Sequence, residues 1–277
     1  MPRNSGQRLS AQDAGGETPP PQDVNSLLDF VIPTEFVELP TKGKFYSKDH
    51  PLHNVEAVEI RYMTAKDTDI LTSKTLLKRG IAIDRMLENV IVDKRVKIKD
   101  LFVGDKNAIV VATRIGGFGE DYEANISCPS CGKSEEQVFN LSEIAPKESE
   151  IEIEFSEDGT FFIELPQTKI NVECRLLTTQ DENNLTNKTE KKQKLGLPES
   201  SLTDQYKSFI VSLNGVTEQG VVDEFVNVMP ARDAHHLKKE YETARPDVDF
   251  RCTYECSNCG AISKADIPFT TNFFWPN

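Results

Sequence analysis

The sequence predicts an α+β fold with an internal duplication: two similar halves, each with helices and a small antiparallel sheet, and each ending in a CxxCG motif. Three observations lead to this prediction. Apolar residues recur at helical spacing in some stretches and alternate with polar residues in others. Two fifteen-residue segments that lie 114 positions apart share seven residues, and two CxxCG motifs lie 128 positions apart.

The chain has 277 residues, a length that suits one large domain or two small ones. Residues 1–24 contain hardly any apolar residue, so we expect a disordered or extended N-terminal arm. Such an arm either has no further role or becomes ordered on a neighbouring subunit. The first half then covers residues 25–147, and the second half covers residues 148–277.

The segment 25–53 is expected to be mainly extended, because Pro33 and Pro40 make a regular helix unfavourable there. A short helix can form at 24–31, before the first of these prolines. The Lys-Gly pair at 42–43 predicts a turn within the extended segment.

Regular periodicity starts at residue 55, where alternation of apolar and polar residues predicts a strand over 55–63. Thr64 followed by Asp67 resembles a helix capping box, so we expect a helix over 64–79 that Gly80 ends. The remaining elements of the first half are a helix at 83–92, a helix at 105–114 ended by Gly116 and Gly117, and a strand at 122–127 that leads into the first cysteine pair.

The second half repeats this order. Its elements are strands at 161–165 and 170–174, a polar helix from Thr178 that frays at 188–194, helices at 205–213 and 231–243, and a strand at 250–255 that leads into the second cysteine pair. The shared residues are Arg61/Arg175, Thr64/Thr178, Asp67/Asp181, Leu71/Leu185, Thr72/Thr186, Lys74/Lys188 and Thr75/Thr189. Chance rarely produces this match and the CxxCG match in the same order. The period is too long for a solenoid repeat.

The two CxxCG motifs contain Cys128 with Cys131 and Cys256 with Cys259. Each resembles half of a zinc ribbon, that is, a zinc knuckle, in which two thiolates grip a metal from one tight turn. Zinc prefers four ligands in a tetrahedron, so the two pairs together supply a complete set. We therefore expect one structural zinc per chain, shared by the four cysteines, to join the two halves about a pseudo-twofold axis.

Other interpretations of the cysteines stay open. A CxxC pair can be redox-active, or each pair can find a third ligand nearby, and Cys252 can compete with Cys256. Cys174 lies in an alternating strand and is expected in the core. A catalytic zinc is disfavoured, because it requires an open coordination position and a general base.

Composition excludes several function classes. The 45 acidic and 32 basic residues give a net charge of −13, which disfavours nucleic acid and anionic membrane surfaces. The longest apolar runs have five residues, far fewer than a membrane span requires, and no secretory signal is recognisable, so we expect synthesis in a cytoplasm. Neither a catalytic triad, a Walker loop nor an HExxH motif occurs, and the glycines at 116–119 follow a helix, so we expect no enzyme.

Aromatic residues near the end of the sequence are candidates for partner contacts. Phe273, Phe274 and Trp275 lie close together, and they either cover their own domain or anchor in a partner. The aromatic residues of the N-terminal segment, Phe36, Phe45 and Tyr46, are further candidates for partner binding.

Two stretches carry a resemblance to a known family. The sequence LPxKGxxY at 39–46 and the sequence YMTAKDxDIL at 62–71 resemble baseplate hub proteins of T-even-type, contractile-tailed bacteriophages, and the CxxCG motifs continue the resemblance over about 32–275. It implies a structural or assembly protein of the tail baseplate hub, with other phage tail proteins as partners. It also implies a place in the virion after assembly in the host bacterial cytoplasm.

The alternative hypothesis is a zinc-ribbon module that binds nucleic acid. The residues that flank the first cysteine pair are acidic, for example Glu120, Asp121, Glu135 and Glu136, and they disfavour this alternative. The hub hypothesis leaves three questions open: whether the protein stays in the mature virion, how many copies are present, and which tail protein it contacts.

Overall fold

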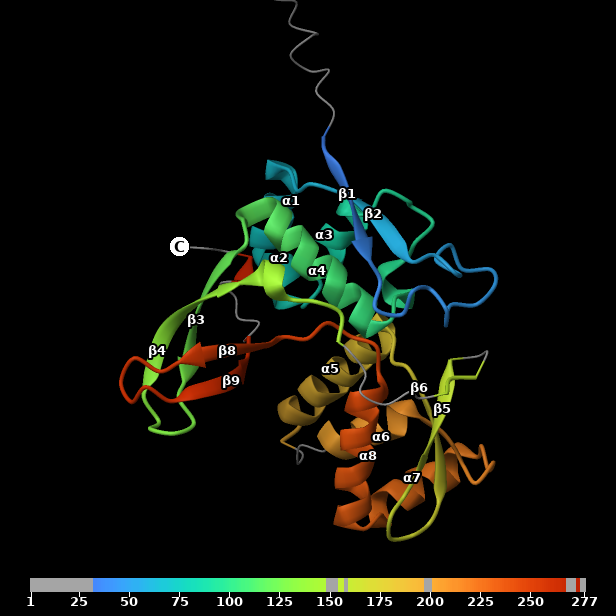
Figure 1. Cartoon of the computed structure of the whole chain (residues 1–277). Helices are drawn as coiled ribbons and strands as arrows, with labels where there is room; N and C mark the ends of the chain where they lie inside the picture. The colour runs from blue at the N-terminus through green and yellow to red at the C-terminus, as the bar shows by residue number, and fades with distance from the viewer. Residues whose placement is uncertain (1–31, 148–153, 157–158, 197–200, 268–272, 275–277) are drawn as a thin grey trace, which may run out of the picture. The chain divides into compact units, whose positions relative to one another are not determined.

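The first sheet of the chain is a long hairpin formed by β1 (Thr34–Glu38) and β2 (Ala57–Arg61), which pair in antiparallel register. The computed structural model describes residues 32–147, 154–156, 159–196, 201–267 and 273–274, and Pro33–Asn277 forms one compact unit (Figure 1). Helices and small antiparallel sheets alternate along it, which confirms the expected α+β class. The predicted arm at 1–24 and the short helix at 24–31 lie outside the described residues.

The connection between β1 and β2 contains the turn that the sequence predicts. Lys42 and Gly43 both have positive φ angles, of 51° and 69°. A Cβ atom on Gly43 would lie 2.4 Å from the carbonyl oxygen of Leu52, so this position has room only for glycine. The connection therefore folds back on itself rather than extending into solvent.

The capping box at the start of α1 (Ala65–Thr72) is confirmed. The Thr64 side chain accepts a hydrogen bond from the backbone N–H of Asp67, and the Asp67 carboxylate accepts one from the backbone N–H of Thr64. The predicted single helix over 64–79 is wrong, because Ser73 has an extended backbone with ψ of 109° and separates α1 from α2 (Lys74–Lys78).

Helix α4 (Val103–Phe118) corrects another prediction, because it continues through Gly116 and Gly117. It ends at Phe118, and the next residue, Gly119, has a φ of 84°. The two glycines have a packing role instead. A Cβ atom on Gly117 would lie 3.2 Å from the Cε atom of Met63, and one on Gly116 would lie 3.3 Å from Glu35 Oε1. They allow the first hairpin and the residues after it to approach the helix closely. The other elements of this region are α3 (Ala82–Val90), η2 (Ile98–Asp100) and η3 (Leu141–Glu143).

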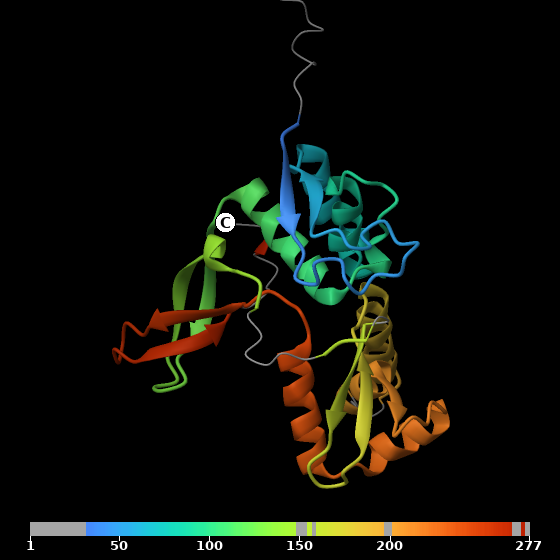
Figure 2. The same ribbon diagram turned by 45° about the vertical axis from the view of Figure 1, so that its right-hand side comes forward.

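Each cysteine pair lies at the tip of a two-stranded hairpin. The first hairpin pairs β3 (Asp121–Ser127) with β4 (Ser134–Asn140), and the second pairs β8 (Arg251–Glu255) with β9 (Ile262–Asp266). The strands before the cysteines were expected, whereas β4 and β9 were not. Figure 2 shows the two hairpins next to each other.

The remaining elements surround a three-stranded sheet with the order β5-β6-β7. Its members are β5 (Thr160–Glu164), β6 (Asn171–Arg175) and β7 (Ile210–Leu213), and its helices are α5 (Thr179–Lys194), α6 (Ser201–Phe209), α7 (Gln219–Val228) and α8 (Ala231–Ala244). The prediction of a helix over 205–213 is wrong for residues 210–213. These residues form strand β7, which pairs with β6. Helix α7 was not expected.

Two hydrophobic clusters form the core. The first contains buried residues of β1 to α4, and also Tyr254, Cys256 and Phe273 from the second half of the sequence. The second contains Phe161, Val172, Leu237 and their neighbours from β5 to α8. The second cysteine hairpin therefore packs with the core of the first half, and the sequence boundary at residue 147 does not coincide with the division between the two clusters.

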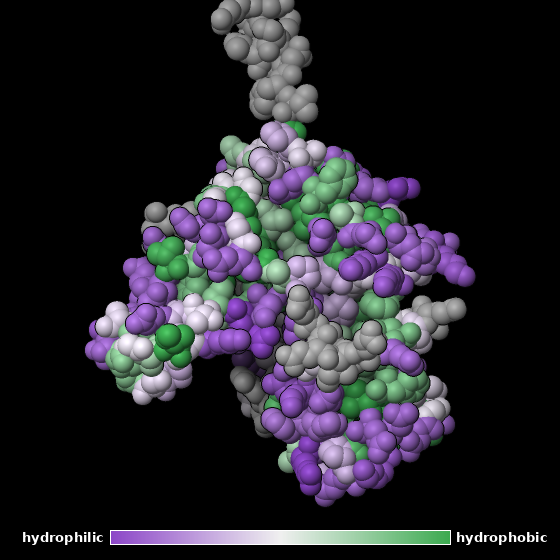
Figure 3. Space-filling view, viewed as in Figure 1, coloured by the Kyte–Doolittle hydropathy of each residue, from purple (hydrophilic) through white to green (hydrophobic). Residues whose placement is uncertain are grey.

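Hydrophilic residues predominate on the face shown in Figure 3, and hydrophobic residues lie between them in several small groups. Of the helices in the described ranges, not one combines the length and the apolar character that crossing a membrane requires.

Candidate metal centre

The cysteine hairpins have the same turn geometry. In the first, the N–H of Cys128 donates to the carbonyl oxygen of Lys133 at 2.9 Å, and the N–H of Gly132 donates to the carbonyl oxygen of Cys128 at 2.8 Å. The second hairpin repeats both bonds, from Cys256 to Ala261 at 3.0 Å and from Gly260 to Cys256 at 2.8 Å. Gly132 and Gly260 have positive φ angles of 72° and 65°, which glycine adopts without strain. Two sequences 128 positions apart thus build one local structure.

The four sulfur atoms of the two pairs meet. They lie within 4.8 Å of one another, with 3.8 Å between Cys128 Sγ and Cys259 Sγ and 3.8 Å between Cys131 Sγ and Cys256 Sγ. Four thiolates at about 2.3 Å from a zinc ion form a tetrahedron with edges of about 3.8 Å. The sulfur positions therefore fit one tetrahedral metal ion, and both of these distances join one hairpin to the other.

The thiol groups differ in how easily they ionise. The backbone N–H of Cys131 is the main cause that lowers the pKa of Cys128, to about 6. The N–H of Ala261 lowers the pKa of Cys259, but desolvation of its sulfur within the cluster and the neighbouring sulfurs outweigh it and raise this pKa to about 12. The pKa is thus lowered for both thiols of the first hairpin, Cys128 and Cys131, and raised for both thiols of the second. Four adjacent thiolates require a cation to balance them.

Polar contacts join the two hairpin tips as well. The Glu135 carboxylate on β4 accepts hydrogen bonds from the N–H of Ser257 at 3.1 and 3.2 Å and from the Ser257 hydroxyl. The Asn258 amide donates to Cys131 Sγ at 3.6 Å. The Ser257 contacts lower the pKa of Glu135, so this carboxylate is held in its charged form beside the cluster. Side chains of this kind orient metal ligands.

The arrangement suits structure rather than catalysis. Cys128 and Cys256 are buried, and Cys131 and Cys259 are exposed. Four thiolates fill a tetrahedral site and leave no position for a substrate. Within the described ranges, no other group of three or more potential ligands comes together, and Cys252 and Cys174 stand outside the cluster. Cys174 is fully buried in β6, as expected of a core residue.

Two aspartates that sequence reasoning missed hold the helices in place. Asp105, on α4, accepts the N–H of Thr41 at 3.0 Å and the hydroxyl groups of Thr41 and Tyr46 at 2.6 and 2.7 Å. Asp233, on α8, accepts the N–H groups of Gln167 and Thr168 at 2.8 and 3.0 Å. Each is fully buried and ties the connection of a β-hairpin to a helix. Asp105 and Asp233 lie 128 positions apart, the same offset as the two CxxCG motifs, so a comparison at this offset of the residues before the motifs would have revealed the pair.

The aromatic candidates in the N-terminal segment have different surroundings. Phe36, on β1, is 73% exposed. Phe45 is partly buried and packs on Phe155, with 4.5 Å between the ring centroids. Tyr46 is buried, stacks on His50 at 4.3 Å and donates to Asp105. The partner-binding role of these three residues stays a prediction.

The aromatic candidates near residue 274 pack within the chain. Phe273 and Phe274 are both buried, and Phe273 lies edge-on to Tyr122 at 5.1 Å. The buried Arg114 donates to the carbonyl oxygens of Phe273, Gly119 and Asp121. Trp275 lies outside the described residues. Partner binding by these aromatic residues stays a prediction.

Comparison with protein families gives one match. The model of a family described as "T4 bacteriophage base plate protein" matches residues 32–275, which is most of the chain. Comparison with curated proteins gives no match, and comparison with solved structures gives none either.

Proposed function

Since the chain belongs to the T4 bacteriophage base plate protein family, we propose that it is a structural or assembly protein of the central hub of a contractile tail baseplate. Membership of this family implies a role in the phage tail baseplate, with other phage tail proteins as partners. The match over residues 32–275 is the observation that carries the proposal. A structural family also favours action by protein–protein contact rather than by catalysis.

Within this role, one zinc ion per chain joins the two hairpins. The support is the close approach of Cys128, Cys131, Cys256 and Cys259 and the fit of their separations to a zinc–thiolate tetrahedron. Because the ligands come from segments more than 120 residues apart, the site is complete only in the folded chain, so the free energy of metal binding adds to the free energy of folding.

The zinc site lies between halves that we interpret as an internal duplication, 25–147 and 148–277. Arg61 forms an ion pair with Asp67 in the first turn of α1, and Arg175 forms one with Asp181 in the first turn of α5. Both aspartates also complete a capping box with the threonine that precedes the helix. The buried aspartate of α4 and that of α8, and the two hairpin tips, extend the correspondence.

Partner contacts of the proposed hub protein involve exposed apolar residues and the N-terminal arm, and assembly takes place in the host bacterial cytoplasm. Phe36 supports this proposal because a large apolar side chain stands in solvent on β1. Nucleic acid is not a proposed partner, because the net charge of −13 opposes phosphate backbones and Glu135 holds a negative charge beside the cysteines.

The experiment uses the phage that encodes the chain, with an amber codon in its gene. Under non-permissive conditions, we expect tails without a complete baseplate centre in electron micrographs, because an essential hub protein is missing. A plasmid copy of the wild-type chain or of Cys252→Ser should restore plaque formation, whereas the double variant Cys131→Ser/Cys259→Ser should not. Mass spectrometry of purified virions then separates a hub subunit, which is present, from an assembly factor, which is absent.

Complete baseplates and normal plaque counts without the chain would contradict the hub role. Restoration by the double cysteine variant would leave the hub role intact but contradict the zinc site as its structural basis. Cys252→Ser is the matched control, because it removes a thiol from the same hairpin outside the cluster.

A further inference from the structure

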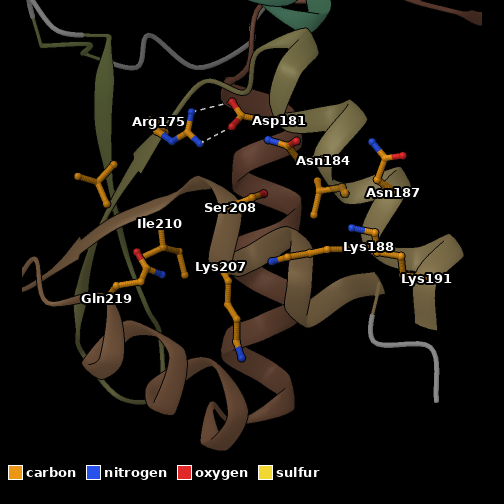
Figure 4. Close-up of a pocket in the computed structure, with 12 residues that line it drawn as sticks. Arg175, Asp181, Asn184, Asn187, Lys188, Lys191, Lys207, Ser208, Ile210 and Gln219 are labelled. Atoms are coloured by element: carbon orange, nitrogen blue, oxygen red, sulfur yellow. Dashed lines mark hydrogen bonds and ion pairs between the residues drawn. The ribbon is translucent and has the colours of Figure 1, made fainter. Parts of the chain in front are cut away.

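A polar cavity of about 870 Å³ lies between α5, α6 and β7, a volume large enough for a sizeable ligand (Figure 4). Three lysines contribute to its wall: Lys188 and Lys191 from α5 and Lys207 from α6. The amide side chains of Asn184, Asn187 and Gln219 line it as well. It lies apart from the cysteine cluster, whose residues do not contribute to its wall.

The charge of this wall differs from that of the chain as a whole. None of the three lysines forms an ion pair with a residue in the described ranges, whereas their neighbours Lys192 and Lys194 pair with Asp204 and Glu190. On α5, the two lysines paired with a carboxylate, Lys192 and Lys194, are thus not among the residues that line the cavity. In a chain with a net charge of −13, Lys188 and Lys191 give this wall a local positive charge that attracts anions, and Lys207 adds to it although its side chain extends away from them in Figure 4.

Among the described residues that line the cavity, the one carboxylate, that of Asp181, is already engaged. Asp181 accepts two hydrogen bonds from the Arg175 guanidinium, both at 2.8 Å, and further hydrogen bonds from the N–H and the hydroxyl of Thr178. Burial alone would raise the pKa of Asp181, but these contacts lower it, so the carboxylate and the guanidinium neutralise each other. Figure 4 shows this pair away from the lysines. It leaves their charge uncompensated.

We propose that this cavity binds a carboxylate-rich peptide segment of another tail protein. The lysines attract the carboxylates, and Asn184, Asn187 and Gln219 can donate to peptide carbonyl groups and accept from peptide N–H groups. No aromatic residue is among those that line the cavity, so the wall offers no platform on which nucleotide bases stack. The choice of a tail protein as the source of the segment rests on the proposed function. The preference for an acidic peptide rests only on the residues that line the cavity.

Fluorescence anisotropy with the purified full chain tests the proposal, with a fluorescein-labelled octaglutamate peptide as the probe. Octaglutamine and an oligo(dT) of equal charge serve as comparison ligands. We expect saturable binding of octaglutamate that weakens with added salt, no binding of octaglutamine, and weaker binding of oligo(dT). The triple variant Lys188→Gln/Lys191→Gln/Lys207→Gln should lose about tenfold or more in affinity for octaglutamate.

The matched control is Lys169→Gln/Lys194→Gln/Lys238→Gln, which removes the same charge from exposed lysines that pair with glutamates outside the cavity. It should keep octaglutamate affinity within about twofold. Equal losses in both triple variants, no binding of octaglutamate, or tighter binding of oligo(dT) would each overturn the proposal. Because this assay contains no phage, such a result leaves the hub role to be judged by the amber-mutant experiment alone.

Discussion

Asp105 and Asp233 occupy the same place in two helices: each is the third residue of its helix, fully buried, and accepts a hydrogen bond from a backbone N–H in the connection of a hairpin. Their second oxygen atoms differ. That of Asp105 accepts two hydroxyl groups, from Thr41 and Tyr46, whereas that of Asp233 accepts the N–H of Thr168. The two sites therefore respond differently to the same substitution.

Replacement of each aspartate by asparagine should separate the two sites. At Asp105, the new amide group meets hydroxyl groups that can accept as well as donate, and a buried charge disappears, so we expect Asp105→Asn to lower the free energy of unfolding by less than about 1 kcal/mol. At Asp233 the amide meets an N–H that can only donate, and we expect Asp233→Asn to cost about 2 to 3 kcal/mol. Urea unfolding followed by circular dichroism measures both.

Alanine variants provide the control for these two positions. Asp105→Ala and Asp233→Ala each leave buried donors unpaired and should each cost about 2 to 3 kcal/mol. Equal costs for the two asparagine variants would contradict the hydrogen-bond assignment at one of the sites.

Acid should weaken the Arg61–Asp67 pair in a defined pH range. Burial alone would raise the pKa of Asp67, but hydrogen bonds from Arg61 and Thr64 lower it from 3.8 to about 2. A lowered native pKa means that the contribution of Asp67 to stability is complete above about pH 4 and is lost as the pH falls towards 2. The difference in unfolding free energy between the wild type and Asp67→Asn should therefore shrink over this range.

Chemical denaturation at a series of pH values measures this difference. Asp69→Asn is a suitable control, because Asp69 lies on the same helix and its side chain makes no ion pair among the residues of known position. A pH-independent difference for Asp67→Asn would show that the ion pair does not contribute in this way.

Removal of the metal should destabilise the chain. We expect one zinc per chain by atomic emission, and loss of that zinc from Cys131→Ser and from Cys259→Ser alike, because each variant breaks a four-thiolate set. Thermal unfolding with and without a strong chelator should show a lower midpoint without metal. Cys252→Ser should retain both the zinc and the midpoint, and two zincs per chain would contradict the shared site.

Loss of Arg114 should release the residues around Phe273. The guanidinium donates to the distant carbonyl oxygen of Phe273 and to two carbonyl oxygens just after α4, those of Gly119 and Asp121. It also lies near the rings of Phe118 and Phe273. Arg114→Met should cost about 3 kcal/mol and accelerate chymotrypsin cleavage after Phe273 and Phe274, because the carbonyl groups lose their donors. Arg85→Met is the matched control, since Arg85 pairs with an exposed Glu88 and should change neither property. Unchanged cleavage in Arg114→Met would show that other contacts hold this segment.

Local patterns in the sequence predicted local structure well. The capping box of Thr64 and Asp67 and the turn at Lys42 and Gly43 depend on neighbouring residues, and both are confirmed. Strands β4 and β9 were missed because each belongs to a two-stranded sheet that is largely exposed, so apolar residues do not alternate clearly along it. Helix α4 was predicted too short, since Gly117 stops a helix by propensity but permits a close contact with Met63 in the folded chain.

The cysteine cluster could be predicted because spacing and repetition carry its signal. Cys128 to Cys131 is a metal-type spacing, and its recurrence at Cys256 to Cys259 suggested that the pairs meet. Arg114 has no such signal, because its partners are carbonyl groups that every residue possesses. Long-range contacts of that kind follow from the packing of the whole chain and not from any one stretch of it.

The separation of the two hairpins also sets an order of events during synthesis. The ribosome releases Cys128 and Cys131 more than 120 residues before Cys256 and Cys259. At bacterial translation speeds this interval is on the order of ten seconds. During that time the first hairpin holds two thiols that cannot complete a tetrahedral site by themselves, so we expect a metal ion to be held by four thiolates only after the second hairpin has been made.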